Sequence, residues 1–432
     1  MSFKQAHYDR SVFIVDGCRT PFLKAGNKPG PFMASDLAVM TGKTLLERQP
    51  FAPTEVDEVI IGCVMPREDE ANIARVISLR LGCGKSVPAW TVQRNCGSGM
   101  QALDSAFKDI SCGRHDLVLA GGTEAMSQAP LIANQELVNW LGDLRHSKNL
   151  LAKLKVILQF RPHFLVPIIA LIHGLTDPTV GMIMGQTAEN LAYLFNITRE
   201  QMDEYSFLSH QRAIAAEKEG HLTEITPLYS QNGVVYEVDT GVRHDTSLEK
   251  LAKLKPIFDK FGRVTAGNSA QVTDGAALLI LASQDAIQRY NLPVLGRIID
   301  VNWAGVEPES MGLGPVFATT PLLQRHGMGL EDIDYWEINE AFAAQVLACL
   351  AAWQDEKFCH KRLGLNGAFG KIDLQRLNVD GGAIAMGHPV GASGARIVLH
   401  LLEVLKRNNA KIGMATLCIG GGQGGAMLLE RL

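Results

Sequence analysis

The sequence predicts an α/β protein made of two similar halves, each with a helix-covered sheet, and a mostly helical insertion between them. The 432 residues, 47% of them hydrophobic, suffice for a large buried core and more than one domain. Short apolar strand patterns alternate with helical patterns, which is typical of a mostly parallel sheet covered by helices. The order strand, glycine-rich turn, helix and strand occurs twice in the chain, and this predicts a duplication. Two unrelated α/β domains would give a similar pattern, and this alternative stays open.

The first copy of this order lies in the N-terminal part of the chain. An apolar strand pattern, VDEVIIGCV, covers Val56 to Val64. The glycine-rich turn RNCGSG, Arg94 to Gly99, leads into a helical pattern from Met100 to Ile110. A buried strand that ends in a glycine pair is then predicted from Asp116 to Ser127.

The second copy lies near the C-terminus. Its first strand pattern, IDYWEI, covers Ile333 to Ile338. A second glycine-rich turn runs into a helix between Gly381 and Leu402, and a closing strand from Ile412 to Glu430 again carries glycines at its end. The sequence therefore predicts two glycine-rich turns that face one another where the halves pack together.

Residues 128 to 255 lack the strand rhythm and are predicted to form an inserted, mostly helical loop domain that covers the site. Helical patterns dominate there, for example from Thr187 to Gly220. Thr198, followed by Gln201 three residues later, has the form of a capping box and predicts a helix start. The predicted domain limits are 1–127 with 256–290 for the N-terminal half, 128–255 for the loop domain and 291–432 for the C-terminal half.

An apolar hairpin is predicted within the loop domain, from Leu151 to Leu175. Its longest uncharged run, Phe164 to Ile172, is too short to span a bilayer. Apolar side chains are expected on one face with basic ones beside them: Leu154, Ile157, Leu158, Phe164, Ile168 and Leu171, next to Lys148, Lys153, Lys155 and Arg161. Such a segment is typical of docking on a membrane interface or a partner. A buried hairpin or an oligomer contact is the alternative, and it stays open.

Charge and cysteine content argue against several classes of protein. The formal net charge is -4 and there is no basic tail, so nucleic acid is not an expected partner. The eight cysteines are scattered, without a C-x-x-C or a zinc-type His/Cys spacing, which predicts reduced thiols and no metal site. The polar start, MSFKQAHYDR, lacks an apolar signal core. We therefore expect a cytoplasmic protein, with peripheral membrane contact through residues 151–175 as an additional possibility.

Cys96 is the first candidate for chemistry. It stands where a strand pattern gives way to a helical one, and a thiol at a helix N-terminus is expected to favour its thiolate form. Gly97 and Gly99 leave space for a substrate and let the backbone approach it. A small residue tolerated in a turn is the structural alternative.

Three further residues are candidates because they lie in comparable turns. His388 stands between glycines in MGHPVGASG, and a histidine is the usual base that accepts the proton of a thiol. Cys418, in CIGGGQGG, is a second thiol in a glycine-rich segment. Asn339 follows a strand pattern, where α/β folds place ligand contacts; its alternative role is to cap a helix from Glu340 to Leu350.

Four blocks, in this order along the chain, resemble the thiolase family: NCGSGMQAL, NEAFAAQ, GHPVGASGAR and CIGGGQGGAM. The segments VDGCRTPF, MGQTAEN, VTAGNSAQVTDGAA and MGLGPV extend the resemblance over essentially the whole chain. The resemblance implies a five-layered α-β-α-β-α fold of two duplicated halves with a loop domain. It also implies an acyltransferase that makes or cleaves 3-ketoacyl-CoA by a ping-pong mechanism, with CoA and acyl-CoA as substrates and no permanently bound cofactor.

The resemblance assigns a role to each candidate residue. Cys96 is the nucleophile that becomes acylated, His388 takes its proton, and Cys418 exchanges a proton with the α-carbon. Asn339 holds a water that, with His388, forms one oxyanion hole. The backbone N–H groups of Cys96 and Gly420 form a second hole around the acyl-enzyme carbonyl. Contacts to CoA or to the acyl-pantetheine arm map to four residues: Met184, Phe258, Met311 and Phe342.

Departures from the family pattern bear on substrate and partners. Ile183 stands where many thiolases have His, and Ala270 replaces a common serine or threonine. The segment 140–178 is long and apolar and resembles the β-subunits of trifunctional fatty-acid oxidation complexes. This favours medium or long acyl chains in β-oxidation, a homo-oligomer (dimer or tetramer) and a hydratase/dehydrogenase α-subunit. Those β-subunits usually carry His where this chain has Asn339, which speaks against that subgroup.

Other functions stay open as alternatives. A biosynthetic acetoacetyl-CoA thiolase would use the same residues on a shorter substrate. A β-ketoacyl synthase of the same superfold usually pairs its cysteine with two histidines, or with a histidine and an asparagine, and the Cys418 block argues against it. A non-catalytic lipid-binding member would be expected to lack Cys96, His388 or Cys418, and all three are present.

Overall fold

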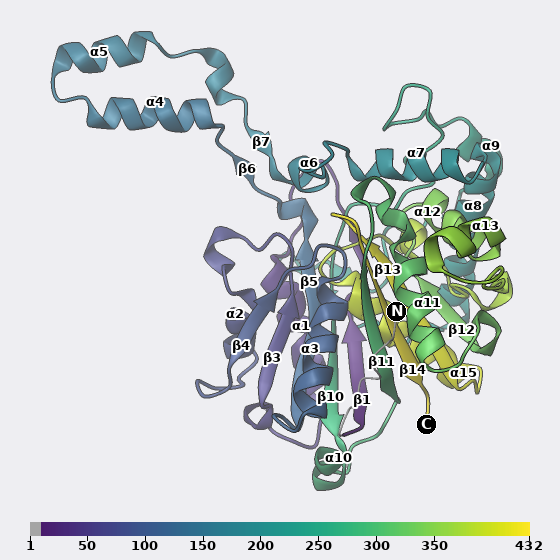
Figure 1. Ribbon diagram of the computed structural model, residues 1–432. Helices are drawn as coiled ribbons and strands as arrows, with labels where there is room; N and C mark the ends of the chain where they lie inside the picture. Colours follow the sequence, from purple (N-terminus) through teal and green to yellow (C-terminus); the bar gives the residue numbers. More distant parts are fainter. Residues whose placement is uncertain (1–9) are drawn as a thin grey trace.

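The computed structural model describes residues 10–432 and contains one long mixed sheet, covered by helices (Figure 1). The first half contributes five of its strands and four helices: β1 (Val12–Arg19), β3 (Glu58–Gly62), β4 (Ala89–Val92), β5 (Leu117–Ala125) and β10 (Thr273–Ser283), with α1 (Ala34–Glu47), α2 (Ile73–Arg80), α3 (Ser98–Ser111) and α10 (Gln284–Tyr290). The short β2 (Leu23–Lys24) pairs with β10.

The second half adds four strands and five helices. They are β11 (Gly296–Gly305), β12 (Tyr335–Ile338), β13 (Ile412–Ile419) and β14 (Gln423–Glu430), with α11 (Gly314–Arg325), α12 (Ala343–Gln354), α13 (Glu356–Phe358), α14 (Ala383–Met386) and α15 (Ser393–Arg407). The two halves join where β1 pairs with β11 over three residues of each strand.

The topology of the two halves is the same, which confirms the predicted duplication. The strand order is β4-β3-β5-β10-β1 in one half and β12-β13-β14-β11 in the other. β3 lies parallel to β5, and β12 lies parallel to β13. On the other side, β10 is antiparallel to β5, and β14 is antiparallel to β13. A single parallel bridge between Trp336 and Leu377 occupies the position that β4 has in the first half. The sheet is thus mixed, and the prediction of a mostly parallel sheet was wrong, because each half closes with antiparallel strands.

Five layers result from the packing of helices on these strands. α3 and α15 contact each other and lie between the strands of the two halves. α1 and α2 cover the outer face of the first half, and α11 packs on the outer face of the second, with α12 packed against it. The expected α-β-α-β-α fold is confirmed. α15 is buried along almost its whole length, as a helix in the central layer must be.

Two glycine segments differ from the prediction. The pair Gly121 and Gly122 lies inside β5 instead of ending it, since the pairing with β10 continues to Ala125. Residue 122 must be glycine because the carbonyl oxygen of Gly391, from the second half, packs where its Cβ would stand. The segment 412–430 is two strands rather than one. Gly421 and Gly422, with φ of 91° and 80°, form the turn between β13 and β14.

The loop domain contains six helices and four two-residue strands within residues 128–255. The helices are α4 (Gln135–His146), α5 (Leu150–Leu158), α6 (Ala170–Gly174), α7 (Met184–Leu194), α8 (Arg199–Glu219) and α9 (Leu248–Ala252). The strands are β6 (Leu131–Ile132), β7 (Ile168–Ile169), β8 (Leu228–Tyr229) and β9 (Val235–Tyr236). The capping box at the start of α8 is confirmed: Thr198 and Gln201 each accept a hydrogen bond from the other's backbone N–H. The domain limits themselves stay a prediction.

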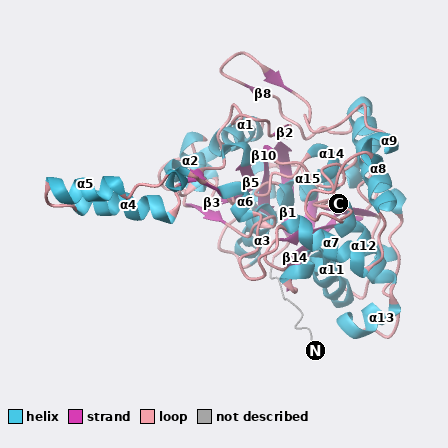
Figure 2. Cartoon of the chain, turned by 90° about the horizontal axis from the view of Figure 1, so that it is seen from above, coloured by secondary structure: helices cyan, strands magenta, loops and turns pink. Residues whose placement is uncertain are grey.

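A helical hairpin projects from the body of the protein, but its position differs from the predicted 151–175. It consists of α4 and α5, and the β6–β7 ribbon connects it to the rest of the chain (Figure 1). Figure 2 shows the same projection from above. Trp140 holds the two helices together by donating to the Val156 carbonyl oxygen at 2.8 Å and packing on Phe160. Residues after Leu158 form short separate elements, because Pro162 and Pro167 interrupt the helical pattern.

The hairpin is not buried within this chain. Its apolar side chains include Leu150, which is 82% exposed, Leu151, 80% exposed, and Leu158, 75% exposed. The interpretation as a hairpin buried in the chain's own core was therefore wrong. Among residues 10–432, no helix has the length and apolar character needed to cross a membrane.

Candidate active site

The predicted catalytic residues come together where three turns from distant parts of the chain meet. These turns precede α3, precede α15 and connect β13 with β14. α3 and α15 approach so closely at their N-terminal ends that only glycine fits. A Cβ on Gly99 would lie 2.9 Å from the Ala395 nitrogen, and one on Gly394 would lie 2.6 Å from the Met100 nitrogen. This contact brings the Cys96 turn and the His388 turn to one cavity.

Cys96 lies in a tight turn immediately before α3. Asn95 adopts a left-handed conformation with φ of 45°, and the side chain of Ser98 fastens the turn by donating to the Asn95 carbonyl oxygen at 2.7 Å. Burial raises the pKa of the Cys96 thiol, although the N–H groups of Gly420 and of Cys96 itself oppose the shift. The expected thiolate is therefore not the resting form, because desolvation outweighs the pull of the helix N-terminus.

His388 is buried and uncharged in this site. Burial, and secondarily the charge of Arg396, lower the pKa of the imidazole to about 4. The Ser393 hydroxyl donates to the Pro389 carbonyl oxygen at 3.1 Å, so at 2.6 Å its oxygen accepts the hydrogen of His388 Nδ1. The other nitrogen, Nε2, then carries a lone pair and has no hydrogen-bond partner among the residues that the structure describes. The ring is thereby prepared to accept a proton at Nε2.

Cys418 and Asn339 are both buried, and Cys418 lines the same cavity as Cys96 and His388. Burial raises the pKa of the Cys418 thiol well above its usual value, and the nearby Cys96 adds to the shift. The backbone N–H of Asn339 donates to the Thr416 carbonyl oxygen at 3.0 Å, on the neighbouring strand. Its side-chain amide is buried, and neither amide atom has a protein partner. The helix-cap alternative for Asn339 was wrong, since α12 begins only at Ala343.

One cavity of about 440 Å³ contains both thiols and His388. All four residues expected to contact CoA or the acyl-pantetheine arm also line it: Met184, Phe258, Met311 and Phe342. Phe258 and Phe342 meet edge to face with ring centroids 6.0 Å apart. Sequence reasoning missed Lys24 and Arg243, which add positive charge to the same wall and come from segments distant in the chain.

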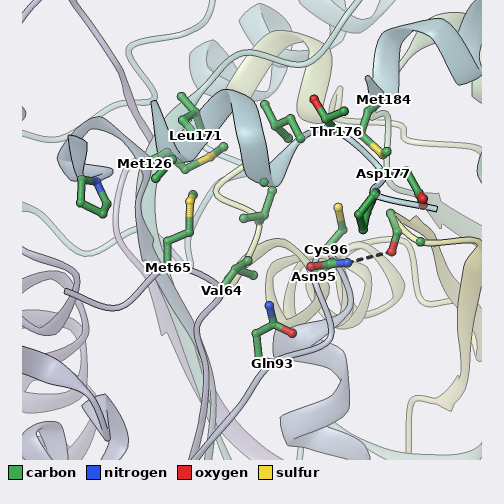
Figure 3. Close-up of a pocket in the computed structure, with 18 of the residues that line it drawn as sticks. Val64, Met65, Gln93, Asn95, Cys96, Met126, Leu171, Thr176, Asp177 and Met184 are labelled. Atoms are coloured by element: carbon green, nitrogen blue, oxygen red, sulfur yellow. Dashed lines mark hydrogen bonds between the residues drawn. The ribbon is translucent and has the colours of Figure 1, made fainter. Parts of the chain in front are cut away.

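A second cavity, of about 400 Å³, begins on another side of Cys96 (Figure 3). The Cys96 thiol points into it, with Met65 and Met126 on one side and Met184 on the other. α6 and the end of the β6–β7 ribbon form part of the wall. Gly420, predicted as an oxyanion donor, lines this cavity, and Asn95 fixes its peptide by donating to the Gly420 carbonyl oxygen at 2.8 Å.

Glu124 is a further residue that sequence reasoning missed. Its buried carboxyl accepts hydrogen bonds from the backbone N–H groups of Val64 and Met65 at 2.9 and 3.0 Å, and from that of Gly391 at 3.1 Å. Burial raises the pKa of this carboxyl to about 7. Glu124 thus connects a cavity wall of the first half to the His388 turn of the second. No local pattern marks it, because its partners are distant in sequence.

Comparisons with known proteins agree with the geometry. The family models of the thiolase N-terminal and C-terminal domains match residues 12–285 and 292–431. The human mitochondrial 3-ketoacyl-CoA thiolase is 38% identical over 428 residues, covering 98% of both chains. The 3-oxoadipyl-CoA/3-oxo-5,6-dehydrosuberyl-CoA thiolase of Escherichia coli K12 is 41% identical over 431 residues, covering 98% of this chain and 100% of that one. The crystal structure of the human enzyme in complex with CoA has a TM-score of 0.84, at 38% identity, and covers 98% of this chain and 99% of that one.

Proposed function

This chain belongs to the thiolase family and is an acyltransferase, and we propose on that premise that Cys96 carries the acyl group between two CoA thiols. The reaction interconverts 3-ketoacyl-CoA plus CoA with acyl-CoA plus acetyl-CoA. The single observation that carries the proposal is the convergence of Cys96, His388 and Cys418 on one cavity from three separate segments of the chain.

In the cleavage direction, the Cys96 sulfur attacks the C3 ketone while its proton passes to Nε2 of His388. This nitrogen is suited to the step because it carries a lone pair and faces no protein donor. The C2–C3 bond then breaks, leaving an acyl group on Cys96 and an enolate of acetyl-CoA. Cys418 gives a proton to C2, and its raised pKa keeps the thiol protonated and ready to do so. Attack of CoA on the acyl-cysteine breaks its thioester bond and releases acyl-CoA. His388 returns its proton to the Cys96 sulfur, and the proton of the CoA thiol restores the Cys418 thiol.

Two groups of donors stabilise the negative charge in these steps. The N–H groups of Gly420 and Cys96 favour negative charge at the Cys96 sulfur, which suits an acyl carbonyl attached there. Asn339 has a buried amide without a protein partner, which suits the holding of a water beside the enolate oxygen. Donors of this kind are worth ~100- to 1000-fold in rate each.

The proposal is tested with the Cys96→Ala variant in a CoA-dependent cleavage assay on 3-ketoacyl-CoA substrates from four to sixteen carbons. We expect activity to fall by ~10⁴-fold or more, as in other enzymes that lose a covalent nucleophile. Cys112→Ala is the matched control, because Cys112 is an exposed thiol at the other end of α3 and is expected to keep full activity. Turnover by Cys96→Ala at the control rate would refute the assignment.

We further propose that the substrate is a medium or long acyl chain in fatty-acid β-oxidation. The second cavity beside Cys96 supports this, since its volume of about 400 Å³ exceeds the needs of an acetyl group. The same assay decides the point. Activity that rises with chain length favours this reading, whereas activity confined to the four-carbon substrate favours a biosynthetic acetoacetyl-CoA thiolase.

The hairpin formed by α4 and α5 is proposed to dock on an anionic membrane surface, as a peripheral contact of a cytoplasmic protein. On α5, five apolar side chains recur at helical spacing: Leu150, Leu151, Leu154, Ile157 and Leu158. Lys153 and Lys155 lie among them, and the hairpin and its flanks carry more basic than acidic residues. Exposed apolar and basic side chains on one helix suit the headgroup region of a bilayer. The hydratase/dehydrogenase α-subunit is the alternative occupant.

A homo-oligomer, a dimer or a tetramer, is part of the proposal. β4 is the last strand on its side of the sheet, and no strand among residues 10–432 pairs with its outer edge. Trp90 on this strand is 37% exposed. Unpaired edges of this kind are sites where a second copy adds its own strand.

A further inference from the structure

The two cavities that meet at Cys96 differ in charge. Five residues line both of them, which identifies their junction: Cys96, Met126, Leu175, Met184 and Val390. The larger cavity has Lys24 and Arg243 in its wall, whereas among residues 10–432 no Lys, Arg or His lines the smaller one. Since the proposed function places a thioester carbon at Cys96, the two arms of the substrate must leave that point through these two cavities.

Charge assigns each arm to a cavity. The CoA arm carries phosphates, so it suits the wall with Lys24 and Arg243. The acyl arm is left with the smaller cavity, whose wall is mainly apolar: Val64, Met65, Met126, Ile132, Leu171 and Val390 are among its residues. Within the described part of the chain, its only ionisable side chain apart from the Cys96 thiol is Asp177.

Asp177 is held in place as an anion. Its carboxylate accepts hydrogen bonds from the Thr179 N–H at 2.8 Å, from the Thr179 hydroxyl and from the Val180 N–H at 3.3 Å. The Thr179 hydroxyl is the main cause that lowers the pKa of this carboxyl below its usual value. The residue is 3% exposed and lines the cavity. Figure 3 shows it beside the Met184 wall, across the cavity from Met65 and Met126.

We propose that the acyl cavity selects uncharged acyl chains and rejects chains that end in a carboxylate, with Asp177 as a specificity-determining residue. A carboxylate on the acyl chain would lose water in an apolar cavity that offers no cation, and it would meet the negative charge of Asp177. This separates the chain from its Escherichia coli relative, which is named for 3-oxoadipyl-CoA, a substrate with a terminal carboxylate. The inference rests on the proposed thiolase reaction.

The test compares 3-ketohexanoyl-CoA with 3-oxoadipyl-CoA, because both have six-carbon acyl groups and differ only in a terminal methyl against a carboxylate. For the wild-type enzyme, we expect kcat/KM to favour 3-ketohexanoyl-CoA by ~100-fold or more. Asp177→Asn keeps an oxygen that accepts the same turn hydrogen bonds but removes the charge, and we expect this ratio to fall ~10-fold. Asp143→Asn is the matched control, since Asp143 is exposed on α4 and is expected to leave the ratio unchanged.

A second variant keeps the test decisive if Asp177→Asn does not fold. Leu171→Arg places a cation in the same wall, and we expect it to improve relative activity on 3-oxoadipyl-CoA. Equal activity of the wild-type enzyme on the two substrates, or a preference for 3-oxoadipyl-CoA, overturns the inference but leaves the thiolase function intact. An enzyme that cleaves neither substrate, nor acetoacetyl-CoA, contradicts the proposed function and the inference with it.

Discussion

At the residue scale, burial sets the protonation of the candidate catalytic groups. Cys96 and Cys418 are kept as neutral thiols, and His388 is kept as a neutral base, because the cavity disfavours each charged form. In the proposed mechanism, these three groups therefore start each turnover uncharged, and charge develops among them as the proton of Cys96 moves to His388. A thiolate activated by a helix terminus, as the sequence suggested for Cys96, would have given a different resting state.

The lowered pKa of His388 predicts that activity persists in mild acid. Because its folded pKa of about 4 lies below the ordinary 6.5, the unfolded chain binds more protons as pH falls. The contribution of neutral His388 to the free energy of unfolding is fully present above pH 6.5 and is lost as pH falls toward 4. We therefore expect kcat/KM for 3-ketoacyl-CoA cleavage to show no acid limb near pH 6.5. A loss of kcat/KM centred near pH 6.5 would contradict this environment for His388. The control is His146→Gln, on the exposed hairpin, which should have the same dependence of kcat/KM on pH as the wild-type enzyme.

At the element scale, α5 is a helix that packs on α4 but leaves its large apolar side chains mostly exposed within residues 10–432. Sequence periodicity indicated an apolar face but assigned it to a longer segment, and only the projection of the α4–α5 hairpin explains why this face is exposed. A helix of this kind gains free energy by burying its side chains in another phase, at roughly 1.5–3 kcal/mol for each large apolar residue.

We predict that α5 binds vesicles that contain phosphatidylserine and binds neutral vesicles less tightly. The double substitution Leu151→Glu and Leu158→Glu should weaken co-sedimentation with anionic vesicles at least ~10-fold, because it removes apolar contact and adds like charge. Phe261→Ser is a fitting control, since Phe261 is 87% exposed but lies outside the hairpin. Retained vesicle binding by the double variant, or an absence of binding by the wild-type protein, would leave the hairpin to a protein partner.

At the scale of the whole molecule, a buried charge network connects the loop domain to both halves. Glu224, from the loop domain, pairs with Arg19 of β1 at 3.1 Å and with His400 of α15 at 3.0 Å. His400 also lies 3.1 Å from Asp380, and Asp239 pairs with Arg19 at 2.7 Å. The two nearby carboxylates raise the pKa of His400 to about 10 against the opposing effect of burial.

We predict that His400→Gln destabilises the protein by about 3 kcal/mol at neutral pH, because buried carboxylates lose their shared cation. A folded pKa of about 10, above the ordinary 6.5, means that this stabilisation is fully present below pH 6.5 and is lost as pH rises through 10. The difference in Tm between the variant and the wild type should therefore shrink toward pH 10. The control is His244→Gln, since His244 is an exposed residue paired with Glu217 at 3.6 Å. A pH-independent difference would contradict the network.

Much of the fold and of the candidate site was predictable from local sequence. Local signals, which depend on neighbours only a few positions away, can be recognised in the sequence alone. They indicated the Thr198 cap, the two strand–turn–helix units and the candidate residues Cys96, His388 and Cys418. The motifs also marked four of the residues that line the larger cavity: Met184, Phe258, Met311 and Phe342.

Only the tertiary structure decided the rest, because those properties arise from contacts between residues far apart in the chain. Residue 122 must be glycine because the Gly391 carbonyl oxygen occupies the place of a Cβ, and the Glu124 carboxyl is buried by segments of both halves. The neutral state of His388 depends on its burial, and the charge difference between the two cavities arises where distant segments meet. The sequence by itself determined which groups are the candidates for the chemistry. Long-range packing decided their protonation, and it left the α5 face exposed.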